Sequence, residues 1–191
     1  MTEQFSKTYW EDRYHAHAGM RDRKPNPQLV AEAAELVPGT ALDAGCGEGA
    51  DAIWLAARGW RVTAVDIATA ALRMAREHAE HAGIAGIDWV PADLTDWTPA
   101  AEHFDLVSAQ YVHPASPHDA LVDRLAAAVA PGGTLLIVDH HGPAGRAVHH
   151  TVLDPDRWEI VVAEERTRSA PHPDGHEVTI RDAVLRARKR R

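Results

Sequence analysis

Apolar and polar positions divide most of the chain into strands that alternate with helices. Segments with strand character end at residues 44, 66, 90, 110 and 138, and the apolar run of the fourth, flanked by polar residues, is typical of a strand covered by helices on both faces. Helical spacing of apolar residues predicts helices over residues 28–37, 51–58, 70–82 and 119–130. Strict alternation of this kind predicts a doubly wound parallel sheet, which binds its ligands beyond the carboxyl ends of the strands.

Local signals set the expected ends and faces of these helices. Thr69 is expected to cap the third helix, and Pro131-Gly132-Gly133 to end the fourth before a strand over residues 134–138. In the helix over residues 51–58, the side chains expected to face the core are Ile53, Trp54, Ala56 and Ala57.

The end of the chain breaks the alternation. Residues 158–164 and 176–187 both have strand character, and a segment rich in proline and glycine joins them. A short connection joins antiparallel strands, so the sheet should close with a hairpin. The predicted fold class is therefore α/β, with a Rossmann-like, doubly wound, mostly parallel seven-stranded sheet and a C-terminal antiparallel hairpin.

The N-terminal segment carries aromatic residues at intervals of one helical turn. Phe5, Tyr9, Trp10 and Tyr14 predict a short helix within residues 1–26. We expect this segment to form a cap over the ligand site, within a single domain that covers residues 1–191.

The clearest chemical signal is the glycine loop Leu42-Asp43-Ala44-Gly45-Cys46-Gly47-Glu48-Gly49-Ala50, between the first strand and its helix. Glycines at alternate positions allow a sharp turn and a close approach of the backbone to a ligand. Asp66 ends the second strand about 20 residues later, where a carboxylate can accept hydrogen bonds from both ribose hydroxyls. The pattern predicts a site for a cofactor that contains a nucleoside, and the loop alone does not distinguish NAD from other cofactors of this kind.

Composition narrows the partners and the compartment. The net charge of -8 argues against binding to nucleic acid or to anionic lipid. Cys46 is the single cysteine, which excludes an internal disulfide and favours a reducing compartment, so we expect a cytoplasmic protein. No apolar run has the length of a membrane span. The basic residues of the tail, Arg186 to Arg191, are expected on the wet face and frayed end of the last strand.

These stretches together resemble the class I S-adenosylmethionine-dependent methyltransferases. The points of match are the glycine loop, Asp66, Asp93-Leu94 after the third strand and Pro131-Gly132-Gly133 before the fifth. The opening Tyr9-Trp10-Glu11-Asp12-Arg13-Tyr14 and Pro25-Asn26-Pro27 look like small bacterial members of the tellurite-resistance and thiopurine type. The resemblance implies methyl transfer from S-adenosyl-L-methionine, an activity of the EC 2.1.1 class.

The resemblance also implies a set of cofactor-binding residues. Gly45, Cys46, Gly47 and Gly49 would line the methionine and ribose portion, with Asp43 beneath them. Asp66, with Ile67 beside it, would hold the ribose hydroxyls, Asp93 and Leu94 the adenine. Gln110 would lie near the sulfonium, and Trp10 would cover the pocket together with Tyr14. Asp93 also suits the simpler role of capping the turn that follows it.

Methyl transfer to a hydroxyl or thiol needs a group that takes up a proton, and histidine suits this role near neutral pH. His113 follows the fourth strand and is the expected catalytic residue; His140 and His141 follow the fifth and are alternatives. His140, His141, His149 and His150 could suggest a metal site, but adjacent imidazoles point apart and no cysteine pair supports them, so no metal is expected.

The acceptor is expected to be a small molecule, neutral or cationic in view of the acidic surface. Relatives often carry a longer segment after the fifth strand than the 14 residues from Asp139 to Val152. That segment commonly walls the acceptor site, so a second chain in a homodimer could complete the pocket. Two other functions remain open: a catalytically silent S-adenosylmethionine-binding or S-adenosylhomocysteine-binding regulatory protein, and a nicotinamide-dependent oxidoreductase.

Overall fold

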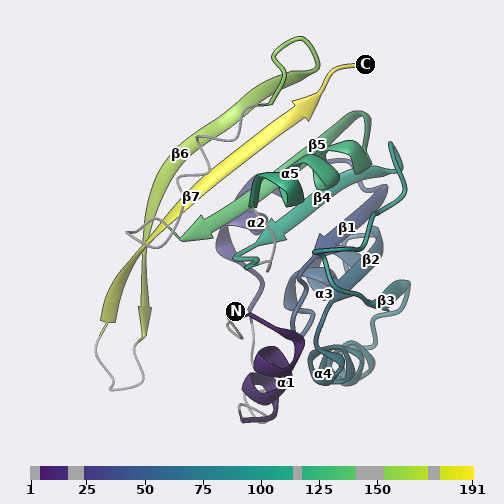
Figure 1. Cartoon of the computed structure of the whole chain (residues 1–191), viewed down its shortest axis with the longest axis vertical. Coiled ribbons are helices and arrows are strands. Elements are labelled where there is room, and N and C mark those ends of the chain that lie inside the picture. Colours follow the sequence, from purple (N-terminus) through teal and green to yellow (C-terminus); the bar gives the residue numbers. More distant parts are fainter. Residues whose placement is uncertain (1–4, 17–23, 114–117, 141–152, 172–176) are drawn as a thin grey trace.

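A seven-stranded sheet in the order β3-β2-β1-β4-β5-β7-β6 forms the centre of the molecule (Figure 1). The computed structural model describes residues 5–16, 24–113, 118–140, 153–171 and 177–191. Its helices are α1 (Lys7–Ala16), α2 (Pro27–Ala33), α3 (Ala50–Ala56), α4 (Thr69–His81) and α5 (His118–Ala128). Its strands are β1 (Thr40–Ala44), β2 (Arg61–Asp66), β3 (Ile87–Pro91), β4 (Phe104–Gln110), β5 (Val129–His140), β6 (Trp158–Pro171) and β7 (Glu177–Lys189).

The pairing of the strands confirms the predicted fold class. β1 pairs in parallel with β2 and β4, β2 with β3, and β4 with β5. β7 runs antiparallel to β5, and β6 antiparallel to β7, so the chain closes with the expected hairpin. All five parallel strands therefore end at one edge of the sheet, where the polar residues predicted to bind a ligand come together.

Alternate side chains of the strands enter two apolar layers, because successive residues of a strand point to opposite faces. On one face Leu42, Val107 and Leu135 pack with Leu121 and Leu125 of α5. On the other face, residues of β2, β4 and β5 pack with side chains from α2, α3 and α4, including Leu29, Leu55 and Leu72. Helices thus cover both faces, which explains why most positions of the central strands β1 and β4 are buried.

Three local expectations need correction. In α3, Trp54 and Ala56 pack against the core as expected, but the fully buried residues are Ala52 and Leu55, and Ala57 is exposed. α4 has Ala68 as its N-cap, because Thr69 is already its first helical residue. α5 ends at Ala128, and residues 131–133 lie inside β5, whose pairing with β4 shifts register between Phe104 and Leu106.

The basic tail corrects another expectation in part. Arg188, Arg190 and Arg191 are exposed, as predicted for the wet face and end of the last strand. Lys189 is buried: its ammonium donates to Glu102 Oε1 at 2.9 Å and to the carbonyl of Val129 at 2.8 Å. A buried ammonium needs such acceptors, and only the fold brings them to the end of β7.

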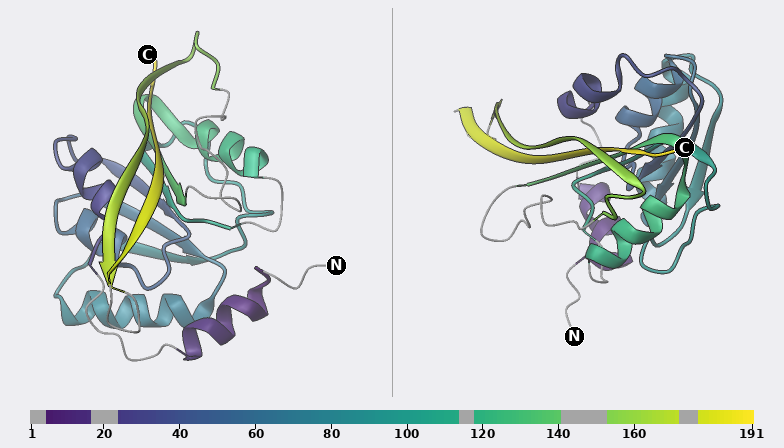
Figure 2. Two further views of the ribbon diagram at one scale, coloured as in Figure 1. Left: turned by 90° about the vertical axis from the view of Figure 1, so that its left-hand side faces the viewer. Right: turned by 90° about the horizontal axis from the view of Figure 1, so that it is seen from above.

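The hairpin of β6 and β7 is longer than the sequence predicted, and it bends away from the sheet (Figure 2). His140, the last residue of β5, pairs with Asp182, and the hairpin continues beyond that pair to Pro171 and Glu177. The hairpin therefore overhangs the edge where the parallel strands end.

Among the helices in the described ranges, none combines the length and apolar character needed to span a bilayer.

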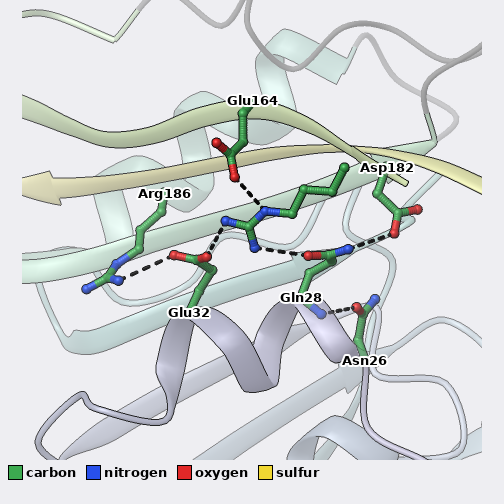
Figure 3. A network of polar contacts seen from close by, with 7 residues as sticks. Asn26, Gln28, Glu32, Glu164, Asp182 and Arg186 are labelled. Carbon is green, nitrogen blue, oxygen red and sulfur yellow. Dashed lines mark hydrogen bonds and ion pairs between the residues drawn. The ribbon is translucent and has the colours of Figure 1, made fainter. Parts of the chain in front are cut away.

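A polar network fixes α2 to this hairpin (Figure 3). Arg166 of β6 donates to Glu32 Oε1 at 2.6 Å and to Gln28 Oε1 at 3.0 Å, while Gln28 Nε2 donates to Asp182 Oδ2 at 3.1 Å. Arg186 of β7 adds a contact of 3.4 Å to Glu32. Both α2 residues are buried, so each buried polar group meets a partner from the hairpin.

Candidate functional site

A cavity of about 770 Å³ lies along the edge where the parallel strands end. Ligand pockets of about 300–1,000 Å³ enclose molecules of drug size, so this one can hold a nucleoside cofactor with a small acceptor. Its walls come from α1, from the carboxyl ends of β1 to β5 and from the hairpin. The lining residues are Phe5, Trp10, Arg13, Tyr14, Gly45, Asp66, Ile67, Asp93, Leu94, Gln110, Tyr111, Val112, His113, His140, Arg168 and Ile180.

Asp66 joins the glycine loop to the end of β2. Its Oδ2 accepts a hydrogen bond from the amide of Gly47 at 2.8 Å, and its Oδ1 accepts from the amide of Ala68 at 2.9 Å. Burial is the largest influence and raises the pKa of Asp66, although these two hydrogen bonds oppose the rise. The carboxylate is held in one orientation at the cavity wall, and each oxygen keeps a further lone pair for a ligand.

Each glycine of the loop lies close to a different side chain, so glycine is required at each position for a different reason. All three have φ between +53° and +82°, a backbone conformation that residues other than glycine rarely adopt. A Cβ on Gly45 would lie 2.6 Å from Val112, and one on Gly47 would lie 2.8 Å from the hydroxyl of Tyr14. A Cβ on Gly49 would lie 2.7 Å from the ring of Trp89. Of the three, Gly45 lines the cavity, while Gly47 and Gly49 permit the close packing that shapes the loop.

Two other residues predicted to bind the cofactor, Asp43 and Cys46, are buried and do not line the cavity. Asp43 is buried, and burial, followed by the charges of Asp51 and Asp66, raises its pKa well above the ordinary value. Its Oδ2 accepts no hydrogen bond from the described part of the chain. Cys46 is also buried, and burial raises the pKa of its thiol well above the ordinary value, so it is no nucleophile near neutral pH.

Asp93 and Leu94 follow β3 and line the cavity beside Asp66 and Ile67. Asp93 also takes the capping role considered for it, because its Oδ1 accepts from the amide of Thr95 at 2.8 Å. The two roles are compatible, since a carboxylate has more acceptor positions than this single bond uses.

Phe5, which precedes α1, and Trp10 of α1 lie over the exit of β4. The ring of Phe5 stacks on that of His113 with centroids 4.9 Å apart, and the ring of Trp10 lies parallel to His113 at 6.5 Å. Gln110, Tyr111, Val112 and His113 all line the cavity at this exit. Oε1 of Gln110 is buried and has no hydrogen-bond partner among the described residues, so a ligand donor can satisfy it.

The hairpin supplies a second wall, which sequence reasoning missed. Arg168 of β6 and Ile180 of β7 are cross-strand partners and both line the cavity. The ring of His140 stacks on Tyr111 with centroids 4.2 Å apart, and Nδ1 of His140 lies 3.9 Å from Oδ1 of the buried Asp182. Burial is the main reason that the pKa of His140 is lowered. The positive φ of Tyr111, 54°, turns the chain here, and no sequence signal indicated it.

Within the described ranges, no group of three or more His, Cys, Asp or Glu side chains comes together in a way that could hold a metal ion. His141, His149 and His150 lie outside the described residues, as does most of the segment from Asp139 to Val152 whose shortness was noted.

The fold and the site define an α/β domain with a site suited to a nucleoside cofactor at the carboxyl ends of its parallel strands. A family model described as a methyltransferase domain matches residues 41–133. Together with the relatives and solved structures below, this match supports a methyltransferase domain of the class I S-adenosylmethionine-dependent type, a family whose cofactor is S-adenosyl-L-methionine.

Three curated relatives illustrate the range of the family. The 2-heptyl-1-hydroxyquinolin-4(1H)-one methyltransferase of Mycobacteroides abscessus is 28% identical over 72% of this chain and 64% of its own length. The trans-aconitate 2-methyltransferase of Paracidovorax citrulli is 37% identical over 60% of this chain and 44% of its own length. That of Azoarcus sp. is 30% identical over 86% of this chain and 63% of its own length. The chain thus spans about two thirds or less of the length of these relatives.

Solved structures show the same fold over nearly the whole chain. One, from work on the conversion of a disulfide bond into a thioacetal group during echinomycin biosynthesis, has a TM-score of 0.73 at 25% identity and covers 97% of this chain and 93% of its own. TehB from Haemophilus influenzae has a TM-score of 0.72 at 18% identity and covers 95% and 67%.

Proposed function

We propose that this protein transfers the methyl group of S-adenosyl-L-methionine to a small-molecule acceptor. The observation that carries the proposal is the position of Asp66, fixed by the glycine loop at the wall of a cavity that continues past β4 to the hairpin. A cofactor would fill only the part near β1, β2 and β3, so the remainder has room for an acceptor. The relatives named above for a quinolone and for aconitate support an acceptor of this size.

The residues present suit this cofactor. Asp66 would accept the ribose hydroxyls, Ile67 would flank them, and Asp93 and Leu94 would contact the adenine. Gly45 would let the backbone approach the methionyl portion, with Gly47, Gly49, Cys46 and Asp43 shaping the loop behind it. Gln110, whose buried Oε1 lacks a partner among the described residues, would accept a hydrogen bond near the sulfonium end. α1 would act as the cap, because Trp10 and Tyr14 form one wall.

The bound cofactor supplies a methyl group already activated by positively charged sulfur, so the protein's main task is alignment of the acceptor. We assign to His113 the uptake of a proton when the acceptor is a hydroxyl or thiol. Its ring is held by Phe5 beside the exit of β4, within the part of the cavity next to Gln110. A catalytically silent role is less well supported, because the cavity extends beyond the cofactor end.

Calorimetric titration tests this function. We expect S-adenosylmethionine and S-adenosylhomocysteine to bind, NAD(H) not to bind, and Asp66→Ala to lose binding by at least about ten-fold, the loss of one or more hydrogen bonds to a charged group. Asp88→Ala is a matched control, since Asp88 is an exposed carboxylate of β3 that does not line the cavity. Binding of NAD(H) alone would contradict the proposal, and donor binding without transfer to a broad acceptor panel would favour the silent role.

A further inference from the structure

The two carboxylates that line the cavity and the arginine of the hairpin lie at opposite ends of the sheet edge. Within the described residues, Asp66 and Asp93 are the carboxylates that line it, and they follow β2 and β3. Arg168 and His140 lie at the other end, on β6 and β5. Neighbouring strands are about 4.8 Å apart, so β2 and β5, three steps apart in the sheet order, are about 14 Å apart. Arg168 is therefore the permanent cation at the acceptor end, and it lies apart from the carboxylates of Asp66 and Asp93 at the cofactor end.

Arg168 has a fixed position at the acceptor end. Its Nε donates to Asp182 Oδ2 at 2.8 Å, and its Nη2 donates to the hydroxyl of Tyr111 at 3.2 Å. The side chain is 26% exposed, so the guanidinium is neither buried nor free to move in water. Because Tyr111 follows Gln110 directly, this contact brings the cation of β6 back across the sheet edge to the exit of β4.

The partner of Arg168 is itself immobilised. Asp182 is fully buried, and its Oδ2 also accepts from Gln28 Nε2 at 3.1 Å. Gln28 in turn is held by Arg166 and lies on α2, which the network of Figure 3 ties to the hairpin. A guanidinium preorganised in this way loses little side-chain entropy when it binds a planar oxyanion, and its fork suits a carboxylate.

We propose that the methyl acceptor carries an anionic group, a carboxylate in preference to a phosphate, which pairs with Arg168 while its nucleophilic atom faces Gln110 and His113. The proposal rests on the methyl-transfer function and adds the substrate class. It replaces the expectation of a neutral or cationic acceptor: that expectation came from the net charge of -8, whereas a ligand in a cleft responds chiefly to the charges that line it.

The cofactor's own carboxylate has a different partner available. Arg13 of α1 lines the cavity one residue before Tyr14, whose hydroxyl lies against Gly47. The methionyl portion is expected at that glycine loop, so Arg13 would lie near its carboxylate. Arg168, on the opposite wall, is left for the acceptor.

The test uses the full chain saturated with S-adenosylhomocysteine. A panel of aromatic and aliphatic carboxylic acids, each paired with its primary amide, is titrated by calorimetry; phenyl phosphate paired with phenol tests the phosphate alternative. We expect several acids to bind at least about ten-fold more tightly than their amides, as for a charge-assisted pair. Arg168→Gln should abolish this preference, Arg168→Lys should retain part of it, and Arg181→Gln, an exposed arginine of β7 away from the cavity, should leave it unchanged.

The outcomes separate this inference from the methyl-transfer function. Failure of S-adenosylhomocysteine to bind the unmodified chain would remove the function itself. Normal cofactor binding with no acid preferred over its amide would overturn the inference alone. So would an Arg168→Gln variant that keeps the preference, or one that loses cofactor affinity while the acids bind as before. Preference for phenyl phosphate over every acid would replace the carboxylate by a phosphate.

Discussion

The carboxylate of Glu11 in α1 caps the N-terminus of α4 at Thr69. Oε1 of Glu11 accepts from the amide of Thr69 at 2.8 Å and from its hydroxyl at 2.5 Å, and Oε2 accepts from the amide of Ala70 at 3.0 Å. The N-cap residue of α4, Ala68, has no side-chain oxygen with which to do this. A residue far away in sequence therefore satisfies the first amides of α4, and at the same time fixes α1 beside α4 (Figure 2).

Glu11→Ala should cost about 1 kcal/mol of stability, as other lost N-caps do. It should also weaken binding of S-adenosylhomocysteine several-fold, because α1, none of whose residues is buried, carries the cavity wall formed by Trp10 and Tyr14. Denaturant unfolding and calorimetry measure the two effects. Asp12→Ala, an exposed carboxylate on the same helix, is the control and should change neither quantity.

The contribution of Glu11 should depend on pH. Burial alone would raise its pKa, but the hydrogen bonds from Thr69 and Ala70 outweigh it, and the pKa of Glu11 is lowered. The contribution is therefore complete above the ordinary glutamate pKa, about 4.3, and is lost as the pH falls through the lowered value. The stability difference between the unmodified chain and Glu11→Ala should shrink over that window; a difference that stayed constant would argue against the cap.

Cofactor affinity should decrease as the pH falls, and the decrease should begin at a higher pH than the titration of an ordinary aspartate would give. Asp66 must be ionised to accept two ribose hydroxyls, and burial raises its pKa. Affinity for S-adenosylhomocysteine should be constant near neutral pH and decline as the pH falls toward this raised pKa, above the usual value of about 3.9. Asp66→Asn should bind weakly throughout with no such decline. Circular dichroism at each pH verifies that the fold persists, and an equal decline in both proteins would assign the effect to another group.

His113→Asn should lower kcat about 100-fold or more on an acceptor that must lose a proton, the usual contribution of a general base. Affinity for S-adenosylhomocysteine should change little, because the proposed role is in the chemical step. Phe5→Leu removes the ring that stacks on His113 and keeps the imidazole. If the two variants lose the same activity, the role of His113 is packing of the cap and not proton uptake.

Lys189→Met should destabilise the protein by about 1–3 kcal/mol, since it leaves the carbonyl of Val129 without its donor. Arg188→Met, at the exposed neighbouring position of β7, should change stability by less than about 0.5 kcal/mol. Thermal or denaturant unfolding measures both. Equal effects in the two variants would mean that the buried contacts of Lys189 contribute nothing specific.

Much of the fold and part of the site could be predicted from local pattern. The apolar residues located β1 to β4 within a few residues, because a strand that packs against the core needs apolar side chains on each face that is covered. The end of β5 and the closing hairpin followed in the same way, but not the early start of β5 at Val129. Gly45, Asp66, Asp93 and Gln110 were placed on one edge, since each follows a parallel strand.

The sequence by itself determined the α/β class, the glycine loop and the cofactor end of the cavity, because those features depend on short spacings within one strand-loop-helix unit. Only the tertiary structure decided the acceptor end. Along the chain, Arg168 lies 57 residues from Tyr111 and 14 residues from Asp182, the two residues that it contacts. Gln28 lies 154 residues from Asp182. Such partners meet only when β6 and β7 fold back over the sheet edge, and no local pattern encodes which side chains the overhang will bring together.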